Sequence, residues 1–287
     1  MSAPLIAAAG LFGLLIGSFL NVVVWRVPRG ESIVRPPSHC PSCGHGIRGH
    51  DNVPLVSWLV LRGRCRDCGA RIPARYPLVE LGTGVAFALV AWWFAIARMP
   101  LHPPGGWGLA AGTTELLAYL YLAAVTIALA LIDLDVFRLP NAIVYPSYAV
   151  GAVLLGLTAL FDALGRSALG ADADGSAALR APVGAAALLL FYLLIVLVYP
   201  AGMGLGDVKL AGVLGLHLAW IGWGVLAVGA FAAFLLGGVF GAALLVARRA
   251  GRKSRIPFGP WMLAGAWVGI VAGEPLATAY LRLSGLS

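Results

Sequence analysis

Long apolar runs separated by short polar segments dominate the hydrophobic pattern of this chain. Seven runs reach the length of about 20 residues that a helix needs to cross a bilayer, and an eighth is shorter. The predicted helices cover residues 5–25, 78–97, 115–133, 142–161, 182–200, 207–220, 222–247 and 260–281. The sixth is the short one, interrupted by glycines and His217. The pattern therefore predicts an all-α polytopic membrane protein with about eight transmembrane helices.

Composition supports a membrane protein. Of the 287 residues, 60% are hydrophobic and 11% are charged, whereas an ordinary soluble domain has about 25% charged residues. The mean hydropathy is +0.90. A chain with so little polar surface is expected in a lipid bilayer.

The lysines and arginines predict the orientation. With the amino terminus outside, the segments 26–77, 134–141, 201–209 and 248–259 lie inside and hold nine, one, one and five of the 20 basic residues. This asymmetry places 26–77 and 248–259 in the cytoplasm. The first helix has no basic segment before it, so we expect a retained anchor rather than a cleaved signal peptide. No aromatic and basic platform accompanies the arginines, so we expect no nucleic-acid partner.

One further segment completes the predicted layout. Residues 162–181, rich in small and acidic side chains, are expected to form a solvated external linker without chemistry. We divide the chain into a first transmembrane helix (1–25), a cytoplasmic loop domain (26–77) and a transmembrane domain (78–287).

The cytoplasmic loop 26–77 contains every cysteine of the chain. They are Cys40, Cys43, Cys65 and Cys68. Two CxxC pairs separated by 21 residues match the spacing of a tetrahedral Cys₄ zinc site. Gly44 and Gly69 directly follow the pairs and permit each turn to fold under the metal. We predict a structural zinc ion that stabilises a loop too small for a strong core of its own.

Disulfides and redox chemistry are the other interpretations of these cysteines. The reducing cytoplasm disfavours disulfides, and a redox CxxC pair would usually occupy a βαβ setting. Four thiolates complete the ligand set, so the nearby His39, His45 and His50 are expected at the surface or behind the ligands.

Acidic residues near the ends of two apolar runs are the candidate chemistry. IDLDVFRLPN (132–141) carries Asp133 and Asp135, and YPAGMGLGDVKLAG (199–212) carries Asp207 behind alternating glycines, Gly202, Gly204 and Gly206. A carboxylate within hydrocarbon costs about 2.5–3.5 kcal/mol. If these helix ends converge, two carboxylates can share a proton and activate water. Aspartates near helix ends are also often simple caps, and intramembrane carboxylates also serve ion transport, so the spacing leaves proteolysis and transport equally open.

Six blocks in order over nearly the whole chain resemble the bacterial type IV prepilin peptidases, which are membrane aspartyl proteases of the GxGD type. They are GSFLNVVVWRVPRGES (17–32), the two cysteine blocks CPSCGHGI and NVPLVSWLVLRGRCRDCGARI taken together, RYPLVELGTG, IDLDVFRLPN, GMGLGDVKL and IPFGP (256–260). The resemblance implies that Asp133 and Asp207 are the catalytic aspartates. Gly204 and Gly206 belong to the second block, and Asp135 is a companion without an assigned role. Lys209 would either keep Asp207 ionised or simply extend to the membrane interface.

The resemblance also implies the substrate and a second activity. The substrate would be a prepilin or pseudopilin of a type IV pilus or type II secretion system. Its short basic leader would be cut at the cytoplasmic face after a glycine, usually before a phenylalanine. Members with this cysteine loop typically also methylate the new amino terminus with S-adenosylmethionine. The chain has no Rossmann glycine fingerprint for that cofactor, and Glu31, Asp51 and Glu80 are polar candidates for its site.

An ion-coupled transporter is the alternative function, although we see no internal repeat that relates the two aspartate blocks. A zinc-bearing membrane scaffold is the third, and it would leave both aspartates replaceable. The oligomeric state is open.

Overall fold

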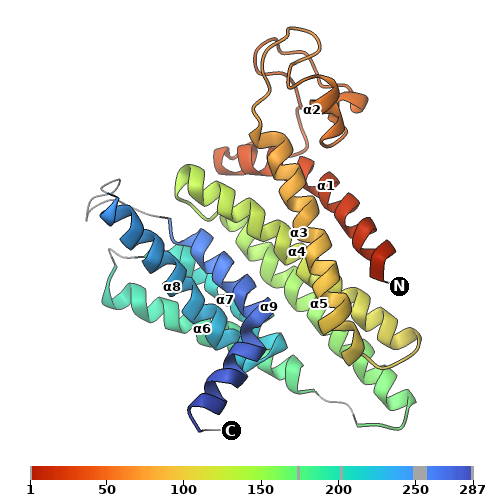
Figure 1. Ribbon diagram of the computed structural model, residues 1–287, viewed down its shortest axis with the longest axis vertical. Coiled ribbons are helices and arrows are strands. Elements are labelled where there is room, and N and C mark those ends of the chain that lie inside the picture. Colours follow the sequence, from red (N-terminus) through yellow and green to blue (C-terminus); the bar gives the residue numbers. More distant parts are fainter. Residues whose placement is uncertain (1, 173–174, 201–202, 248–256, 286–287) are drawn as a thin grey trace. The chain divides into compact units, whose positions relative to one another are not determined.

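The computed structural model describes residues 2–172, 175–200, 203–247 and 257–285, and these residues are mostly helical (Figure 1). The long helices are α1 (Ser2–Arg26), α3 (Arg75–Ala97), α4 (Gly106–Val136), α5 (Asn141–Ala168), α6 (Ser176–Val198), α7 (Leu205–Ile221), α8 (Trp223–Val246) and α9 (Gly259–Leu283). The short ones are α2 (Val56–Val60) and the 3₁₀ turns η1 (Val27–Arg29), η2 (Gly49–Asn52) and η3 (Met99–Leu101). Within the described ranges no β-strand is present, and the extended backbone pairs only in two isolated β-bridges. The predicted all-helical fold is confirmed.

All eight predicted helices are present in the described chain, and seven of them are long and apolar enough to cross a membrane. The eighth, α7, has 17 residues and is about 26 Å long, shorter than the roughly 30 Å hydrocarbon core. Helix α4 begins at Gly106 rather than at the predicted residue 115. The polar residues that marked the predicted boundary are accommodated in the helix. Glu115 is fully buried, and the Thr113 hydroxyl donates to the Leu109 carbonyl at 2.7 Å.

The structure divides into two compact units. The first contains residues 1–101 and 119–128 and joins α1, the cysteine loop and α3. Close approach between α1 and α3 requires glycine: a Cβ on Gly13 would lie 2.8 Å from the Cβ of Phe87, and one on Gly17 would lie 2.7 Å from the Cα of Glu80. Small residues bring membrane helices together in this way. The cysteine loop lies at one end of this helix pair (Figure 1).

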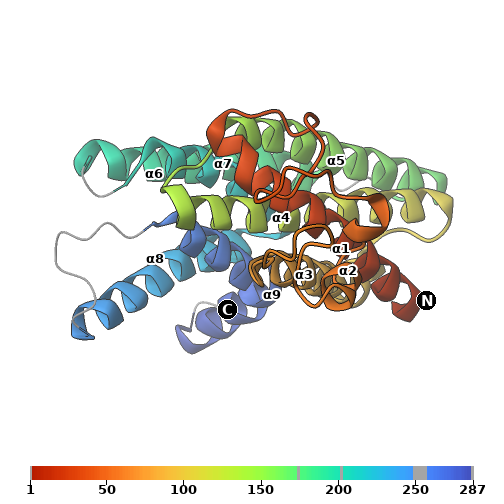
Figure 2. The same ribbon diagram turned by 90° about the horizontal axis from the view of Figure 1, so that it is seen from above.

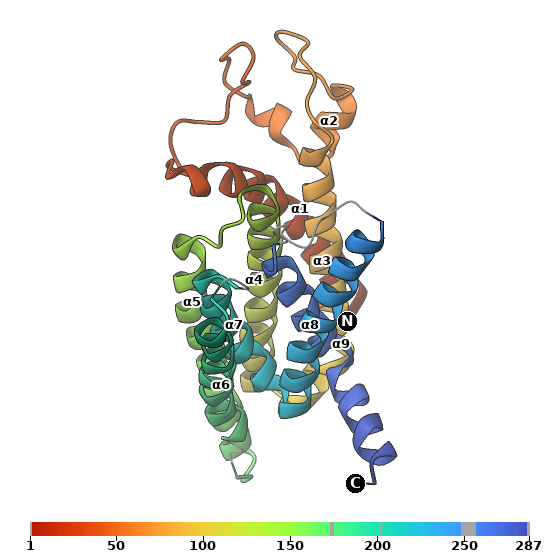
Figure 3. The same cartoon turned by 90° about the vertical axis from the view of Figure 1, so that its left-hand side faces the viewer.

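The second unit contains residues 102–118 and 129–287, and α7 is its centre. Helix α7 contacts α5, α6, α8 and α9, and its residues 210–220 are all buried. Figures 2 and 3 show α6 alongside α7 and α8 alongside α9. Each pair meets through small residues, with Gly184 on α6 against Ala219 on α7, and Gly229 on α8 against Gly265 on α9.

The carboxyl end of α7 is held by an arginine from α6. The Arg180 guanidinium donates to the carbonyls of Ala219, Trp220 and Ile221 at 2.6, 2.8 and 3.2 Å. These carbonyls belong to the last turn, whose acceptors have no partner within the helix itself. Arg180 therefore supplies donors to the carboxyl end of α7.

The expectation of a solvated linker at 162–181 was wrong for most of its length. Helix α5 continues to Ala168, and α6 begins at Ser176. Asp162 lies inside α5 and contacts Nδ1 of His102 at 2.9 Å. The alanines and leucines of this stretch favour helix, and the contact with His102 compensates the negative charge of the Asp162 carboxylate.

His102 joins three helices of the second unit. Its Nε2 lies 2.9 Å from the buried Glu115 carboxylate of α4, which also accepts a hydrogen bond from Nε1 of Trp220 on α7 at 3.1 Å. Burial opposes the imidazolium charge, but hydrogen bonds with Asp162 and Glu115 prevail and raise the pKa of His102 to about 9.

Candidate active site and metal centre

Asp133 lies in the last turn of α4, where the sequence ends the helix abruptly. Phe137 adopts a left-handed conformation with φ 54°, and its N–H donates to the Asp133 carbonyl at 2.9 Å. The Asp133 side chain is 5% exposed. Its Oδ2 accepts a hydrogen bond from the backbone N–H of Gly259 at 3.2 Å. Gly259 is the first residue of α9, so an otherwise unused helix amide and the positive end of the helix dipole face this carboxylate.

Asp207 lies in the first turn of α7 and caps the amino end of the same helix. Its Oδ2 accepts a hydrogen bond from the Gly204 N–H at 3.1 Å, which is the return bond of a capping box. Gly204 is the N-cap in extended conformation, so the irregular backbone that the glycines predict ends at this residue. Gly202 lies outside the described residues.

The two aspartates come together in the second unit, as the hypothesis of convergent helix ends required. Leu139, just beyond α4, packs against both partner helices. A Cβ on Gly206 would lie 3.2 Å from its Cβ, and one on Gly259 would lie 3.3 Å from its Cδ2. The Asp133 carboxylate also interacts electrostatically with Asp207. The site therefore consists of one helix carboxyl end and two helix amino ends.

The structure places Lys209 against α5. Its Nζ donates to Oδ1 of Asn141 at 3.1 Å and lies 5.3 Å from the ring centroid of Tyr145. The Tyr148 hydroxyl donates to the Lys209 carbonyl at 2.6 Å. These contacts hold the first turn of α7 against α5, and they give Lys209 a partner other than Asp207. Asp135 is exposed, and its role stays a prediction.

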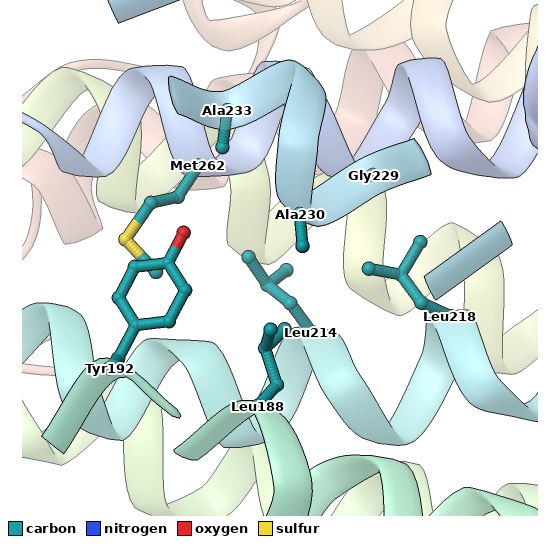
Figure 4. A pocket seen from close by; sticks show the side chains of 8 residues that line it. All are labelled: Leu188, Tyr192, Leu214, Leu218, Gly229, Ala230, Ala233 and Met262. Carbon is teal, nitrogen blue, oxygen red and sulfur yellow. The ribbon is translucent and has the colours of Figure 1, made fainter. Parts of the chain in front are cut away.

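A small cavity lies within the second unit among residues of α6, α7, α8 and α9, with the Tyr192 ring at one side (Figure 4). Its volume is about 10 Å³, and apolar side chains such as Leu188, Leu214 and Met262 line most of it. A cavity of this size holds about one water molecule. It is too small for a peptide, and neither Asp133 nor Asp207 lines it. Tyr192 itself is buried, and its ring packs against Phe234 and Phe258 with centroids 5.5 and 6.4 Å apart.

The two CxxC pairs form matching turns in the first unit. In the first turn the N–H of Gly44 donates to the Cys40 carbonyl at 2.9 Å, and in the second the N–H of Gly69 donates to the Cys65 carbonyl at 2.9 Å. Gly44 and Gly69 have φ angles of 75° and 71°, the left-handed region in which a side chain is unfavourable. The role predicted for these glycines is confirmed.

The four sulfurs fit a zinc ion. All four ligand atoms lie within 4.8 Å of one another, and the sulfurs of Cys40 and Cys68 are 3.8 Å apart. A tetrahedron with Zn–S bonds of about 2.3 Å has sulfurs about 3.8 Å apart. Backbone hydrogen bonds from Ser42 and Cys43 lower the pKa of the Cys40 thiol to about 6. A backbone hydrogen bond from His45 also lowers the pKa of the Cys43 thiol, but burial and the three other sulfurs prevail and raise it to about 12. Cys40 is therefore a thiol that readily becomes the thiolate that binds metal. His39, His45 and His50 are exposed and lie outside this group, as expected.

Ion pairs tie the two cysteine turns together. Arg66 forms a bidentate pair with Asp51, which lowers the pKa of that carboxyl, and Arg48 pairs with Asp67 at 2.9 Å. The Glu80 carboxylate accepts the Leu55 N–H at 2.8 Å. Two of the polar residues considered for the cofactor, Asp51 and Glu80, therefore have structural partners.

Comparison with known proteins identifies the family. Residues 11–94 match the bacterial peptidase A24 N-terminal domain, and residues 120–242 match the type IV leader peptidase family. The chain is 36% identical to a prepilin leader peptidase/N-methyltransferase of Aeromonas salmonicida, covering 94% of this chain and 92% of the relative. It is 35% identical to proteins of the same name from Stutzerimonas stutzeri, covering 98% and 95%, and Pseudomonas aeruginosa, covering 96% and 93%. No solved structure matches. The chain belongs to the prepilin leader peptidase/N-methyltransferase family.

Proposed function

We propose that this protein cleaves the leader peptide of type IV prepilins or pseudopilins through Asp133 and Asp207. The observation that carries the proposal is the meeting of these carboxylates where α4 ends and α7 and α9 begin. Family membership favours this function over an ion-coupled transporter.

In the proposed reaction one carboxylate is ionised and the other is protonated. The ionised carboxylate takes a proton from water, whose oxygen attacks the scissile carbonyl carbon, while the protonated carboxyl donates a hydrogen bond to the carbonyl oxygen. When the C–N bond breaks, the proton taken from water passes from that carboxyl to the leaving amine, the leader ends in a carboxyl group, and leader and mature pilin separate. The hydrogen bonds from Gly259 and Gly204 orient the two carboxylates.

The basic leader places the reaction on the cytoplasmic side of the inner membrane. The proposed topology has the amino terminus outside, so that α4 ends and α7 and α9 begin at the cytoplasmic face. All five basic residues of 248–259 that support this orientation lie outside the described part of the chain. The substrate's own apolar helix would remain in the bilayer while its leader reaches the aspartates.

We also propose that the first unit carries an N-methyltransferase activity, as the names of the relatives indicate for those proteins. S-adenosylmethionine would supply the methyl group for the new amino terminus. The Cys₄ site would hold a structural zinc ion that fixes the loop.

Incubation of purified protein with a prepilin, followed by mass spectrometry of the new amino terminus, tests both activities. Asp133→Asn and Asp207→Asn should each abolish cleavage, since each carboxyl has a separate role. Asp135→Asn should be milder, and Asp172→Asn, at an exposed loop position, is the matched control. Substantial cleavage by either Asp133→Asn or Asp207→Asn would contradict the two-aspartate assignment.

A further inference from the structure

A larger cavity lies in the first unit, between the second half of α1 and the loop residues 33–38 and 52–54. Its volume is about 310 Å³, and sites for cofactors and drug-sized ligands typically measure about 300–1,000 Å³. Every lining residue belongs to this one unit. The cavity is therefore large enough for a small organic ligand and independent of the aspartates of the second unit.

Arg26 gives the cavity a buried positive charge. This last residue of α1 lines the cavity, and it is 8% exposed. Its Nη1 donates to the Ser32 carbonyl at 3.0 Å, and within the described chain no carboxylate forms an ion pair with it. A guanidinium has five N–H donors, and burying its charge is costly unless an anion or a full set of acceptors compensates it. The structure thus provides an anion-binding group inside a ligand-sized cavity.

The remaining walls restrict the class of ligand. The Phe19 ring and prolines such as Pro37 give flat apolar surfaces, and Ser18, Ser38 and Asn52 add hydroxyl and amide groups. Such walls suit a planar heterocycle joined to a hydroxyl-bearing sugar, while Arg26 suits a carboxylate, for which its planar fork is well matched. The basic leader of a prepilin would instead meet a like charge at Arg26.

We infer that this cavity binds the methyl donor S-adenosylmethionine, with the donor's carboxylate on Arg26. The inference rests on the proposed methyltransferase activity and assigns that activity a place in the chain. It also links the cofactor site to the cysteine loop, because the Ile47 N–H of the first cysteine turn donates to the carbonyl of the cavity residue Ser38 at 2.8 Å. Arg26 is here a binding residue, and the aspartates play no part.

Calorimetric titration of the purified, full-length, zinc-loaded protein tests the inference. The probes are S-adenosylmethionine, S-adenosylhomocysteine and decarboxylated S-adenosylmethionine. Losing a hydrogen-bonded charge partner corresponds to roughly 10–100-fold in affinity. Arg26→Gln should weaken the first two ligands by about this factor and leave the decarboxylated ligand unchanged. In the wild-type protein the decarboxylated ligand should already bind more weakly by a similar factor.

The matched control is Arg29→Gln. Arg29 lies one turn further along the chain, is exposed and stacks over the Trp25 ring outside the cavity. This variant removes the same charge and should bind all three ligands like the wild type. Ser18→Phe, which fills the cavity from α1, should weaken all three. Wild-type rates of prepilin cleavage by each variant show that the fold is intact. If Arg26→Gln does not fold, the cavity assignment is still tested by Ser18→Phe and by the comparison of the three ligands in the wild-type protein.

The outcomes separate the inference from the proposed function. A wild-type protein that neither binds S-adenosylmethionine nor methylates a cleaved pilin would contradict the methyltransferase proposal itself. A wild-type protein that methylates, with Arg26→Gln binding S-adenosylmethionine and S-adenosylhomocysteine as tightly as the wild type does, would overturn the cavity assignment alone. In nanodiscs, addition of phosphatidylglycerol should leave the affinity unchanged. Displacement of the methyl donor by that lipid would assign Arg26 to a lipid phosphate and also overturn the inference.

Discussion

Gly259→Ala is the substitution that best tests how the aspartate site is held. Gly259 donates its N–H to Asp133 at the start of α9. An added Cβ would lie 2.7 Å from Oδ2 of Asp133 and 3.3 Å from Cδ2 of Leu139. The structure therefore has no room for a methyl group between the helix end and the carboxylate, and the carboxylate must move.

The displacement sets the expected loss of activity. Ordinary contact begins at 3.4 Å, so the separation must grow from 2.7 Å by about 0.7 Å. A misplacement of about 1 Å in an active site can cost roughly 100-fold in rate, and we expect the rate of prepilin cleavage to fall roughly 10–100-fold. Alanine is the better helix former by about 1 kcal/mol, so the loss should not come from unfolding of α9.

Steady-state cleavage of a prepilin measures the effect, with thermal unfolding followed by tryptophan fluorescence as the check on folding. Gly238→Ala is the control, because a Cβ on Gly238 of α8 meets open space and gives the same gain in helix propensity. Methylation of a pilin that has already been cleaved should persist, since the first unit is untouched. A folded Gly259→Ala protein with wild-type cleavage kinetics would refute the idea that the start of α9 positions Asp133.

Three further predictions concern the metal, the pH response and the topology. Metal analysis should find about one zinc per chain, and finding none while all four thiols are reduced would rule out the site. Gly69 has a φ angle of 71°, so Gly69→Ala should destabilise the loop by about 1–2 kcal/mol. Folding raises the pKa of His102 from 6.5 to about 9, so the interaction of His102 with Glu115 and Asp162 should stabilise the fold fully below pH 6.5 and progressively less up to about pH 9. The melting temperature should therefore fall over this pH range. His102→Gln should flatten the dependence of the melting temperature on pH. In a cysteine-free background that still folds, a cysteine at Ser176 should react with an impermeant reagent from outside. One at Ser254, which lies outside the described residues, should not, and the reverse labelling would turn the aspartates to the wrong face.

The helices and the cysteine site could be predicted because their signals are local. An apolar run of helical length is visible in a short window, and two CxxC turns with glycines carry their own geometry. The convergence of Asp133 and Asp207 followed from topology, since both lie at helix ends assigned to the same face.

The contacts that hold the site could not be predicted from one sequence. Gly259 and Asp133 are 126 residues apart. The donor is a backbone N–H, which every residue except proline has, so the sequence does not indicate it. The Lys209–Asn141 hydrogen bond spans 68 residues, so it depends on how α5 and α7 pack. Asp162 was assigned to the solvated linker at 162–181 because its polarity matched a linker, whereas packing makes it a partner of His102.

The contact between Arg180 and the end of α7 has a consequence for depth in the membrane. A helix of about 26 Å within roughly 30 Å of hydrocarbon must leave an end below the surface, and backbone carbonyls at such an end require partners from the protein. Arg180 supplies them and so takes the place of the missing turn of helix. With its far end satisfied in this way, α7 can stay short, and under the proposed topology its near end would hold Asp207 beneath the cytoplasmic interface, within reach of water and an extended peptide. A change at Arg180, at the opposite end of the helix, would therefore alter the depth at which hydrolysis occurs and leave the carboxylates themselves untouched.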